Sequence, residues 1–151
     1  MPLPVRKNGL RRSKLITPAD NWDLMLKASR SEADIIHLEM EDGVINERKE
    51  IGRELCLKAM LEIDWGGKEL WVRINHFDSG LAEIDVEALI AGAPNLIQLA
   101  KTQGPEDMIR LDGLVAAAER KHGIKPGTVT IGAVLERVRG LAKVEDIALS
   151  T

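Results

Sequence analysis

The sequence predicts an α/β fold in which a parallel sheet is built from five consecutive strand–helix units. Five short apolar runs alternate with stretches in which apolar residues recur at helical spacing, and this alternation implies parallel strands joined by right-handed helical crossovers. Of the 151 residues, 44% are hydrophobic and 30% charged, an ordinary globular composition. No linker, internal repeat or low-complexity stretch divides the chain, so we predict one domain over residues 1–151.

The apolar runs that we interpret as strands are short, and most of them end in a polar residue. In a parallel α/β sheet, whether open or closed, ligands bind at the carboxyl ends of the strands. The polar residues at these ends are therefore the first candidates for a functional site. The predicted strands are Lys14–Thr17, Asp34–Glu39, Glu69–Asn75, Leu96–Lys101 and Val129–Glu136.

The segments between the strands carry helix signals. Asp20 or Asn21 is expected to cap the first helix and Asn46 the second, because their side chains accept hydrogen bonds from the free amides of a first turn. Pro105 and Gly123 mark the two ends of another helix, because proline is tolerated in the first turn of a helix and glycine commonly follows the last turn. These helices are predicted over Asp85–Ala91, from Pro105 to Gly123, and from near Val144 onward.

Two architectures satisfy this pattern. Five units in about 150 residues match a five-stranded doubly wound sheet of the flavodoxin type. A complete (β/α)8 TIM barrel needs about 250 residues, so the chain would supply only the first five units of an incomplete barrel. The pattern alone favours the doubly wound sheet.

The predicted strand ends combine acids, bases and an amide. Carboxylates beside basic groups suit a divalent cation together with a carboxylated substrate, because Mg²⁺ prefers carboxylate and water oxygens and arginine grips carboxylates with two parallel hydrogen bonds. The candidate residues are Thr17, the acidic stretch Glu39-Met40-Glu41-Asp42, Arg73, Asn75, Lys101 and Glu136.

Five short stretches at these strand ends occur in a fixed order and together resemble one family. The residues are Arg12-Ser-Lys-Leu-Ile-Thr-Pro18, Glu39-Met-Glu-Asp-Gly-Val44, Val72-Arg-Ile-Asn75, Leu99-Ala-Lys101 and Leu135-Glu136. They resemble Arg-Ser-x-Leu-Phe-Val-Pro, Asp-Leu-Glu-Asp-Ala-Val, Val-Arg-Ile-Asn, Leu-Pro-Lys and Ile-Glu of the citrate lyase β-subunit family, within the HpcH/HpaI aldolase/citrate lyase superfamily. The resemblance extends from Arg12 over nearly the whole chain.

This resemblance implies a TIM barrel, and it overrides the doubly wound reading. It also implies an Mg²⁺-dependent oxo-acid lyase that cleaves the carbon–carbon bond of a citryl- or malyl-type β-hydroxy acyl thioester. The products would be an oxo acid such as oxaloacetate, or an aldehyde, and an acetyl thioester carried by coenzyme A or acyl-carrier protein. Mg²⁺ would stabilise the enolate that forms during cleavage.

The resemblance also implies roles for individual residues. Arg73 would bind the oxo-acid carboxylate and polarise its carbonyl group, and Glu136 would be one carboxylate ligand of Mg²⁺. Glu41 and Asp42 would orient Arg73 and metal-bound water. Without the resemblance, a structural ion pair of Arg73 with Glu41 or Asp42 is the favoured interpretation, and Glu39 is interpreted as structural.

Two further basic residues are expected near the substrate. By the same resemblance, Arg12 would face the substrate mouth, and Lys101 would contribute positive charge there as a salt-bridge partner rather than as a catalytic base. The sequence departs from the family pattern at Glu39, Ala100 and Arg137, where the family has Asp, Pro and Thr. The family's second metal ligand, an Asp after the sixth strand, lies beyond residue 151, so the active site is expected to be incomplete in this chain.

Composition excludes other classes of protein. No run of about 18 apolar residues predicts a membrane span, and no basic block predicts nucleic-acid binding. The single cysteine, Cys56, fits a reducing cytoplasm and is interpreted as a buried structural thiol. His37 is expected in the core, and His76 is an outside candidate for ligand contact. Open strand edges in a partial barrel predict a homo-oligomer or lyase complex, and favour as an alternative a non-catalytic half-barrel subunit that pairs with another chain.

Overall fold

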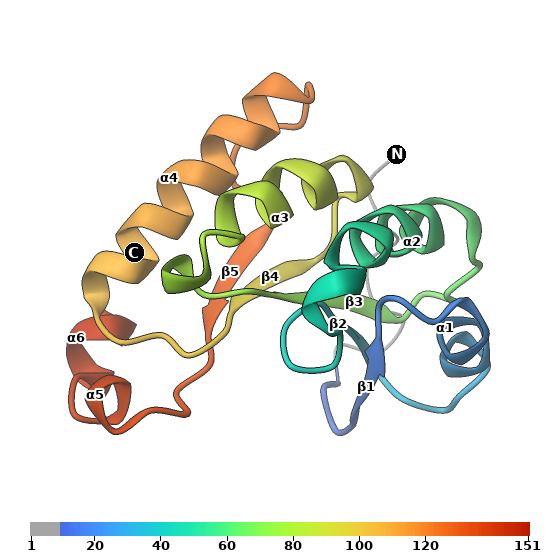
Figure 1. Cartoon of the computed structure of the whole chain (residues 1–151), viewed down its shortest axis with the longest axis horizontal. Helices are drawn as coiled ribbons and strands as arrows, with labels where there is room; N and C mark the ends of the chain where they lie inside the picture. The colour runs from blue at the N-terminus through green and yellow to red at the C-terminus, as the bar shows by residue number, and fades with distance from the viewer. Residues whose placement is uncertain (1–9) are drawn as a thin grey trace.

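The computed structural model describes residues 10–151, which form a five-stranded sheet with its main helices on one side (Figure 1). Neighbouring strands follow the chain order β1-β2-β3-β4-β5, and every pair is parallel. A doubly wound sheet of the flavodoxin type would instead have the order 2-1-3-4-5. The sequential order excludes that alternative and is the order of the first five units of a TIM barrel.

The observed strands agree with the prediction in number and place, but the third, fourth and fifth strands end earlier at their carboxyl sides than predicted. Lys101 and Glu136 therefore lie in the loops that follow the fourth and fifth strands. The bounds are β1 (Lys14–Pro18), β2 (Ile35–Glu39), β3 (Glu69–Ile74), β4 (Leu96–Leu99) and β5 (Thr130–Ala133).

The helices confirm some of the predicted boundaries and correct others. Asn21 caps the first helix, its side-chain oxygen accepting a hydrogen bond from the amide of Leu24 at 3.0 Å. Asn46 is not a cap, since it begins a 3₁₀ turn that precedes the second helix. The third helix starts three residues before the predicted Asp85, and the short helix α5 was not predicted. The helices are α1 (Trp22–Ser29), α2 (Lys49–Glu62), α3 (Ala82–Leu89), α4 (Pro105–Lys121), α5 (Val138–Leu141) and α6 (Val144–Ala148), with 3₁₀ turns η1 (Asn46–Arg48), η2 (Phe77–Ser79) and η3 (Ile90–Gly92).

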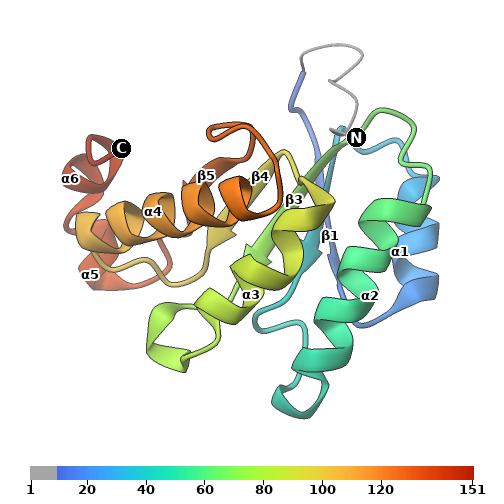
Figure 2. The same ribbon diagram turned by 90° about the horizontal axis from the view of Figure 1, so that it is seen from above.

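The two faces of the sheet have different surroundings. Figure 2 shows α1, α2, α3 and α4 side by side in chain order along the sheet. Because successive strand residues point to opposite faces, alternate residues pack beneath these helices and form the core. The buried strand residues of this helix-covered face include Ile36, Leu38, Leu70, Val72, Ile74, Ile97 and Leu99.

The opposite face, which we call the inner face, corresponds to the interior of a barrel. Ile16, His37 and Trp71 are register partners on β1, β2 and β3 and share this face. Ile16 is 52% exposed, so the described residues do not cover this edge of the inner face. One step nearer the carboxyl ends, Glu39 and Arg73 are register partners on the same face. The fold therefore brings the acidic stretch and Arg73 together at the barrel mouth.

Within residues 10–151 the structure contains no helix that is both long enough and apolar enough to cross a membrane.

Candidate active site at the carboxyl ends of the strands

Arg73 stands at the centre of the polar residues at the carboxyl ends of the strands. Its Nε donates a hydrogen bond to Oε2 of Glu39 at 2.5 Å. Its two terminal nitrogens lie 3.7 Å from a carboxylate oxygen of Glu41 and of Glu136, which are ion-pair contacts rather than hydrogen bonds. Burial disfavours the guanidinium charge, but Glu39, Glu136 and Glu41 outweigh it and raise the pKa of Arg73. The side chain remains 17% exposed at the mouth.

Glu39 is the acid that orients Arg73, a role that the sequence analysis gave to Glu41 and Asp42. Its side chain is buried, and its second oxygen accepts a hydrogen bond from the amide of Glu41 at 2.5 Å. Burial raises the pKa of Glu39, while Arg73 opposes that shift. The sequence analysis interpreted Glu39 as structural and did not identify it as the register partner of Arg73 on the next strand. The period-two alternation of a strand places Glu39 on the same face as His37, but the pairing with Arg73 also depends on the register between the two strands.

Lys101 neutralises the rest of the acidic stretch. Its ammonium group donates to Oδ1 of Asp42 at 2.9 Å and also to the carboxylate of Glu41. The hydrogen bond to Glu41, followed by that to Asp42, raises the pKa of Lys101. Lys101 is therefore held as an ammonium ion, which suits a salt-bridge partner and not a nucleophile or a general base. The same contact with Lys101 lowers the pKa of Asp42.

Glu136 lies in the loop between β5 and α5 and is the least shielded glutamate that faces Arg73, its side chain being 32% exposed. Its Oε1 accepts a hydrogen bond from the backbone amide of Lys101 at 3.0 Å. Lys101 adopts a left-handed backbone conformation, with φ of 51°. This conformation is uncommon for a residue with a side chain.

The fit of these residues to a magnesium ion is partial. Glu39 is bound to Arg73, and Glu41 and Asp42 are bound to Lys101, so Glu136 is the carboxylate best placed to accept a metal ion. Within residues 10–151 there is no group of three or more His, Cys, Asp or Glu side chains arranged to hold a metal. The described residues therefore offer one carboxylate ligand and need others to complete a site.

A buried polar network holds the acidic stretch from below. The ammonium group of Lys49, at the start of α2, donates to the backbone carbonyls of Met40 and Glu41, both at 2.6 Å. The side-chain amide of Asn75 donates to the same carbonyl of Met40 at 3.2 Å and to Asp85 at 2.6 Å. The sequence analysis named Asn75 among the candidate residues at the strand ends, and it missed Lys49.

Asp85 anchors this network on α3. Its carboxylate is fully buried and also accepts hydrogen bonds from the backbone amide of Asn75 at 3.0 Å and from Nε of Arg53 at 2.7 Å. A buried charge is tolerated only when it is paired and hydrogen-bonded, and Asp85 has both kinds of partner. The loops after β2 and β3 are thus tied to α2 and α3.

Arg12 lies outside this site, and the prediction that it faces the mouth is wrong. It precedes β1 at the amino ends of the strands, where its guanidinium pairs with Asp34 at 2.8 Å. Thr17 also points away from the mouth, because it is in register with Leu38 on the helix-covered face. His76 is turned towards α4, with its Nε2 3.1 Å from Asp107, and is buried.

Gln98 is a further mouth residue that the sequence analysis missed. It is the register partner of Arg73 on β4 and shares the inner face. Its side-chain oxygen is buried without a hydrogen-bond partner among the described residues. The sequence signal was its position as the one polar residue of the four in β4.

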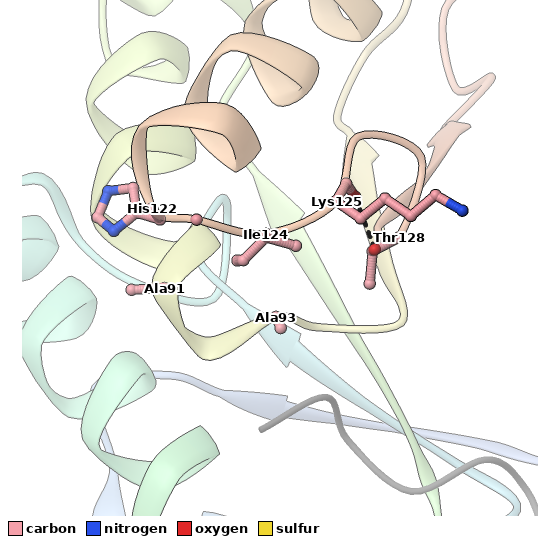
Figure 3. A pocket seen from close by; sticks show the side chains of 7 residues that line it. Ala91, Ala93, His122, Ile124, Lys125 and Thr128 are labelled. Carbon is pink, nitrogen blue, oxygen red and sulfur yellow. Dashed lines mark hydrogen bonds between the residues drawn. The ribbon is translucent and has the colours of Figure 1, made fainter.

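A separate pocket lies at the opposite ends of β4 and β5 (Figure 3). It has a volume of about 400 Å³ and is formed by the turn after α3, with Ala91 and Ala93, and the loop between α4 and β5. The side chains of His122 and Lys125 point in opposite directions in Figure 3. These residues therefore do not converge on a common ligand position, and the pocket is remote from Arg73.

Comparisons with known proteins agree with this architecture. The family model for HpcH/HpaI aldolase/citrate lyase matches residues 12–151. Citrate lyase subunit beta of Leuconostoc mesenteroides subsp. cremoris is 31% identical over 139 residues, covering 92% of this chain and 46% of the relative. L-malyl-CoA/beta-methylmalyl-CoA lyase of Rhodobacter capsulatus is 34% identical over 153 residues, covering 99% and 47%. The chain thus spans about half the length of the curated relatives it matches.

Solved structures give the same result. The citrate lyase beta subunit of Mycobacterium tuberculosis, complexed with oxaloacetate and magnesium, superposes with a TM-score of 0.70 at 26% identity, covering 93% of this chain and 55% of that one. The CitE protein of the same organism, in complex with magnesium, acetoacetate and coenzyme A, gives a TM-score of 0.71 at 26% identity, covering 94% and 47%. The fold and the match of the family model over residues 12–151 together show that the chain belongs to the HpcH/HpaI aldolase/citrate lyase family.

Proposed function

We propose that this chain supplies the oxo-acid-binding half of the active site of a magnesium-dependent carbon–carbon lyase. The substrate class is a citryl- or malyl-type β-hydroxy acyl thioester, cleaved to an oxo acid and an acetyl thioester. The observation that carries the proposal is the position of Arg73, fixed by Glu39 at the carboxyl ends of the strands with its terminal nitrogens at the mouth. The M. tuberculosis relative that binds oxaloacetate and magnesium supports this substrate class.

Arg73 is suited to bind the carboxylate of the oxo acid. Its Nε is occupied by Glu39, which leaves the two terminal nitrogens to make a two-pronged contact with a planar carboxylate. An incoming substrate carboxylate would replace the longer contacts with Glu41 and Glu136, both at 3.7 Å. The buried pair with Glu39 fixes the plane of the guanidinium before substrate arrives, which reduces the entropy lost on binding.

Glu136 is the proposed carboxylate ligand of the magnesium ion, and coordination by Glu136 would place the ion beside the Arg73 subsite. When bound, the ion would supply Lewis-acid stabilisation of the enolate charge that carbon–carbon cleavage creates. Lys101 and the acidic stretch would hold Glu136 in place and balance the charge around it. Further oxygen ligands would come from water, substrate and polypeptide other than residues 10–151.

The test uses Arg73→Lys, which keeps the charge but removes the planar pair of donors. Oxaloacetate binding in the presence of Mg²⁺ is measured by calorimetry, and oxo-acid release from malyl-CoA and citryl-CoA is assayed. Both are done with the chain alone and mixed with the second half of the barrel of a relative. We expect the substitution to weaken oxaloacetate binding by about tenfold or more. The matched control is Arg110→Lys, because Arg110 is exposed and pairs with Glu83 on α3. Equal oxaloacetate affinity in the parent and in Arg73→Lys refutes the proposed role of Arg73.

A second candidate function, a half-barrel subunit that pairs with a second copy of the chain, is favoured by the inner face. Ile16 is half exposed there, and the ring nitrogens of His37 and the side-chain oxygen of Gln98 are buried without partners among the described residues. A facing polypeptide would cover Ile16 and so remove its apolar side chain from water. Light scattering would then show a dimer that Ile16→Lys converts to monomer. A monodisperse monomer at micromolar concentration contradicts this candidate.

A further inference from the structure

Gly140, in the short helix α5, lies against the loop that follows β4. The residue is buried, and a Cβ atom built on it would collide with the backbone carbonyl oxygen of Thr102 and lie 3.3 Å from the carbonyl carbon. Gly140 is not among the glycines with positive φ, so its backbone conformation accepts an L-residue. The need for glycine at this position therefore comes from the space that the Thr102 carbonyl group occupies.

Thr102 is held too firmly to move aside for an added methyl group. It is fully buried, its amide donates to the carbonyl of Val134 at 3.1 Å, and its hydroxyl donates to the carbonyl of Leu99 at 3.0 Å. A backbone carbonyl also lacks the alternative rotamers that let the end of a long side chain swing away. Helix α5 is held less firmly, because its side chains Val138 and Leu141 are largely exposed. An added methyl group should therefore displace α5 and leave the loop in place.

The same two segments meet again at Glu136, four residues before Gly140. The Glu136 carboxylate accepts a hydrogen bond from the backbone amide of Lys101 at 3.0 Å, and Lys101 directly precedes Thr102. The contacts of Glu136 and Gly140 thus fall on consecutive residues of one loop. The first residue of α5 is only two positions after Glu136. A displacement of α5 would therefore be passed to the Glu136 carboxylate through a very short connection.

We propose that Gly140 is a positioning residue for Glu136. The close approach of α5 to the Thr102 carbonyl, which a residue with a Cβ atom would prevent, keeps the Glu136 carboxylate on the Lys101 amide. Helix propensity gives no other reason for glycine here, because glycine disfavours a helix relative to alanine. The role of Glu136 as a metal ligand rests on the proposed function, whereas the coupling of Gly140 to the hydrogen bond between Glu136 and Lys101 does not.

The experiment measures amide hydrogen exchange by NMR in the whole chain, in Gly140→Ala and in Glu136→Ala. In Glu136→Ala the Lys101 amide has lost its acceptor, so its exchange rate there defines the rate without this hydrogen bond. Gly140→Ala should raise the exchange rate of the Lys101 amide about tenfold or more towards that value, because the displaced helix withdraws the carboxylate. The amides of β2 and β3 should keep the protection that they have in the parent chain, since neither strand contacts α5 through Gly140.

The matched control is Gly113→Ala in α4, where an added Cβ atom meets nothing within 4 Å, and it should leave the exchange of the Lys101 amide unchanged. The double variant of Gly140→Ala and Glu136→Ala should exchange at Lys101 no faster than Glu136→Ala alone, since the acceptor is already absent. Parental exchange at Lys101 in Gly140→Ala overturns the proposal, as does a further increase in the double variant. Loss of protection across β2 and β3 in Gly140→Ala also overturns it, because the glycine would then be required for the fold as a whole.

Magnesium binding separates this inference from the proposed function. In the mixture with the second half of a relative's barrel, Gly140→Ala should weaken Mg²⁺ binding by about tenfold, as the loss of a group that orients a metal ligand does. Oxaloacetate binding without Mg²⁺ should stay unchanged, because Glu39 holds Arg73 independently of α5. Faster Lys101 exchange in Gly140→Ala, with no Mg²⁺ binding by the parent mixture, supports the coupling and refutes the metal role of Glu136. Mg²⁺ binding by the parent mixture, with parental Lys101 exchange in Gly140→Ala, does the reverse.

Discussion

Acidification is expected to destabilise the fold through His37. Its side chain lies on the inner face between Ile16 and Trp71, is 2% exposed, and contacts the Trp71 ring edge-on with the centroids 6.3 Å apart. Neither ring nitrogen has a hydrogen-bond partner among the described residues. Burial, followed by the positive charges of Lys14 and Arg73, lowers the pKa of His37 from 6.5 to about 3. The imidazole is therefore neutral in the folded protein.

The size of the effect follows from proton linkage. Between pH 6.5 and 3 the unfolded chain binds a proton at His37 that the folded chain does not, so the free energy of unfolding falls as the pH is lowered through this window. From pH 7 to pH 5 the loss is about 2 kcal/mol. This loss of unfolding free energy is set by the ordinary pKa of His37 in the unfolded chain, because the His37 ring of the folded chain is still neutral at pH 5. It is a large fraction of the stability of a domain of this size.

The assay is urea unfolding at pH 7 and pH 5 for the parent chain and for His37→Phe, which keeps an aromatic ring and removes the titrating group. The carboxyl groups, including Glu39 near the same face, are common to both proteins and cancel in the difference. The parent should lose about 2 kcal/mol more than the variant between the two pH values. His122→Gln is the control, because His122 is at the end of α4 near Glu87. Equal losses in the parent and His37→Phe would refute the argument.

Three further predictions concern other parts of the structure. Asp85→Ala leaves its buried arginine partner unpaired and should cost about 3–5 kcal/mol in urea unfolding, whereas Glu83→Ala, on the exposed side of the same helix, should cost less than about 1 kcal/mol. Lys101→Met removes the first cause of the lowered pKa of Asp42, so NMR titration should show that pKa rising towards its ordinary value; an unchanged value contradicts the ion pair. Cys56 is fully buried, and burial raises the pKa of its thiol, so a thiol reagent should react with it only after unfolding, and rapid native labelling contradicts this placement.

The sequence predicted the order of the elements well because hydrophobic periodicity is a local property. The apolar runs that became β2 and β3 lie within a residue of their predicted limits. The choice between an open sheet and a barrel was not local: both are built from the same units and differ only in which strands are neighbours. Pattern alone favoured the wrong architecture, and only the resemblance corrected it.

The candidate site was predicted in its residue types but not in its pairings. Glu39, Glu41, Arg73, Lys101 and Glu136 do meet at one end of the sheet, as the rule for parallel strands implies. Which acid contacts Arg73 depends on the register between β2 and β3, and a shift of one residue would turn Glu39 to the other face. That register is decided by the packing of both strands against the helices.

Arg12 and Lys49 show two other limits of sequence reasoning. Arg12 belongs to a motif that ends at the mouth, yet a strand rises about 3.3 Å per residue, which places Arg12 about 20 Å from the carboxyl end of β1. Lys49 would be expected on the surface from its residue type, because lysine is rarely buried. Its burial depends on hydrogen bonds to the backbone carbonyls of Met40 and Glu41 after β2, and no local sequence pattern predicts these hydrogen bonds.

The two halves of the proposed site differ in what holds them. The arginine side is fixed entirely by described residues: Glu39 holds Arg73, and Lys49 and Asn75 both hold the carbonyl of Met40. The metal side rests on Glu136, whose carboxylate is a third exposed and is held mainly by a backbone amide. Completion of the site should therefore change magnesium affinity far more than it changes the position of Arg73. Oxaloacetate without Mg²⁺ should then bind this chain about as well alone as when it is mixed with the second half of a relative's barrel, and Mg²⁺ should strengthen oxaloacetate binding only in the mixture. Equal Mg²⁺ enhancement in both would show that Glu136 and water suffice.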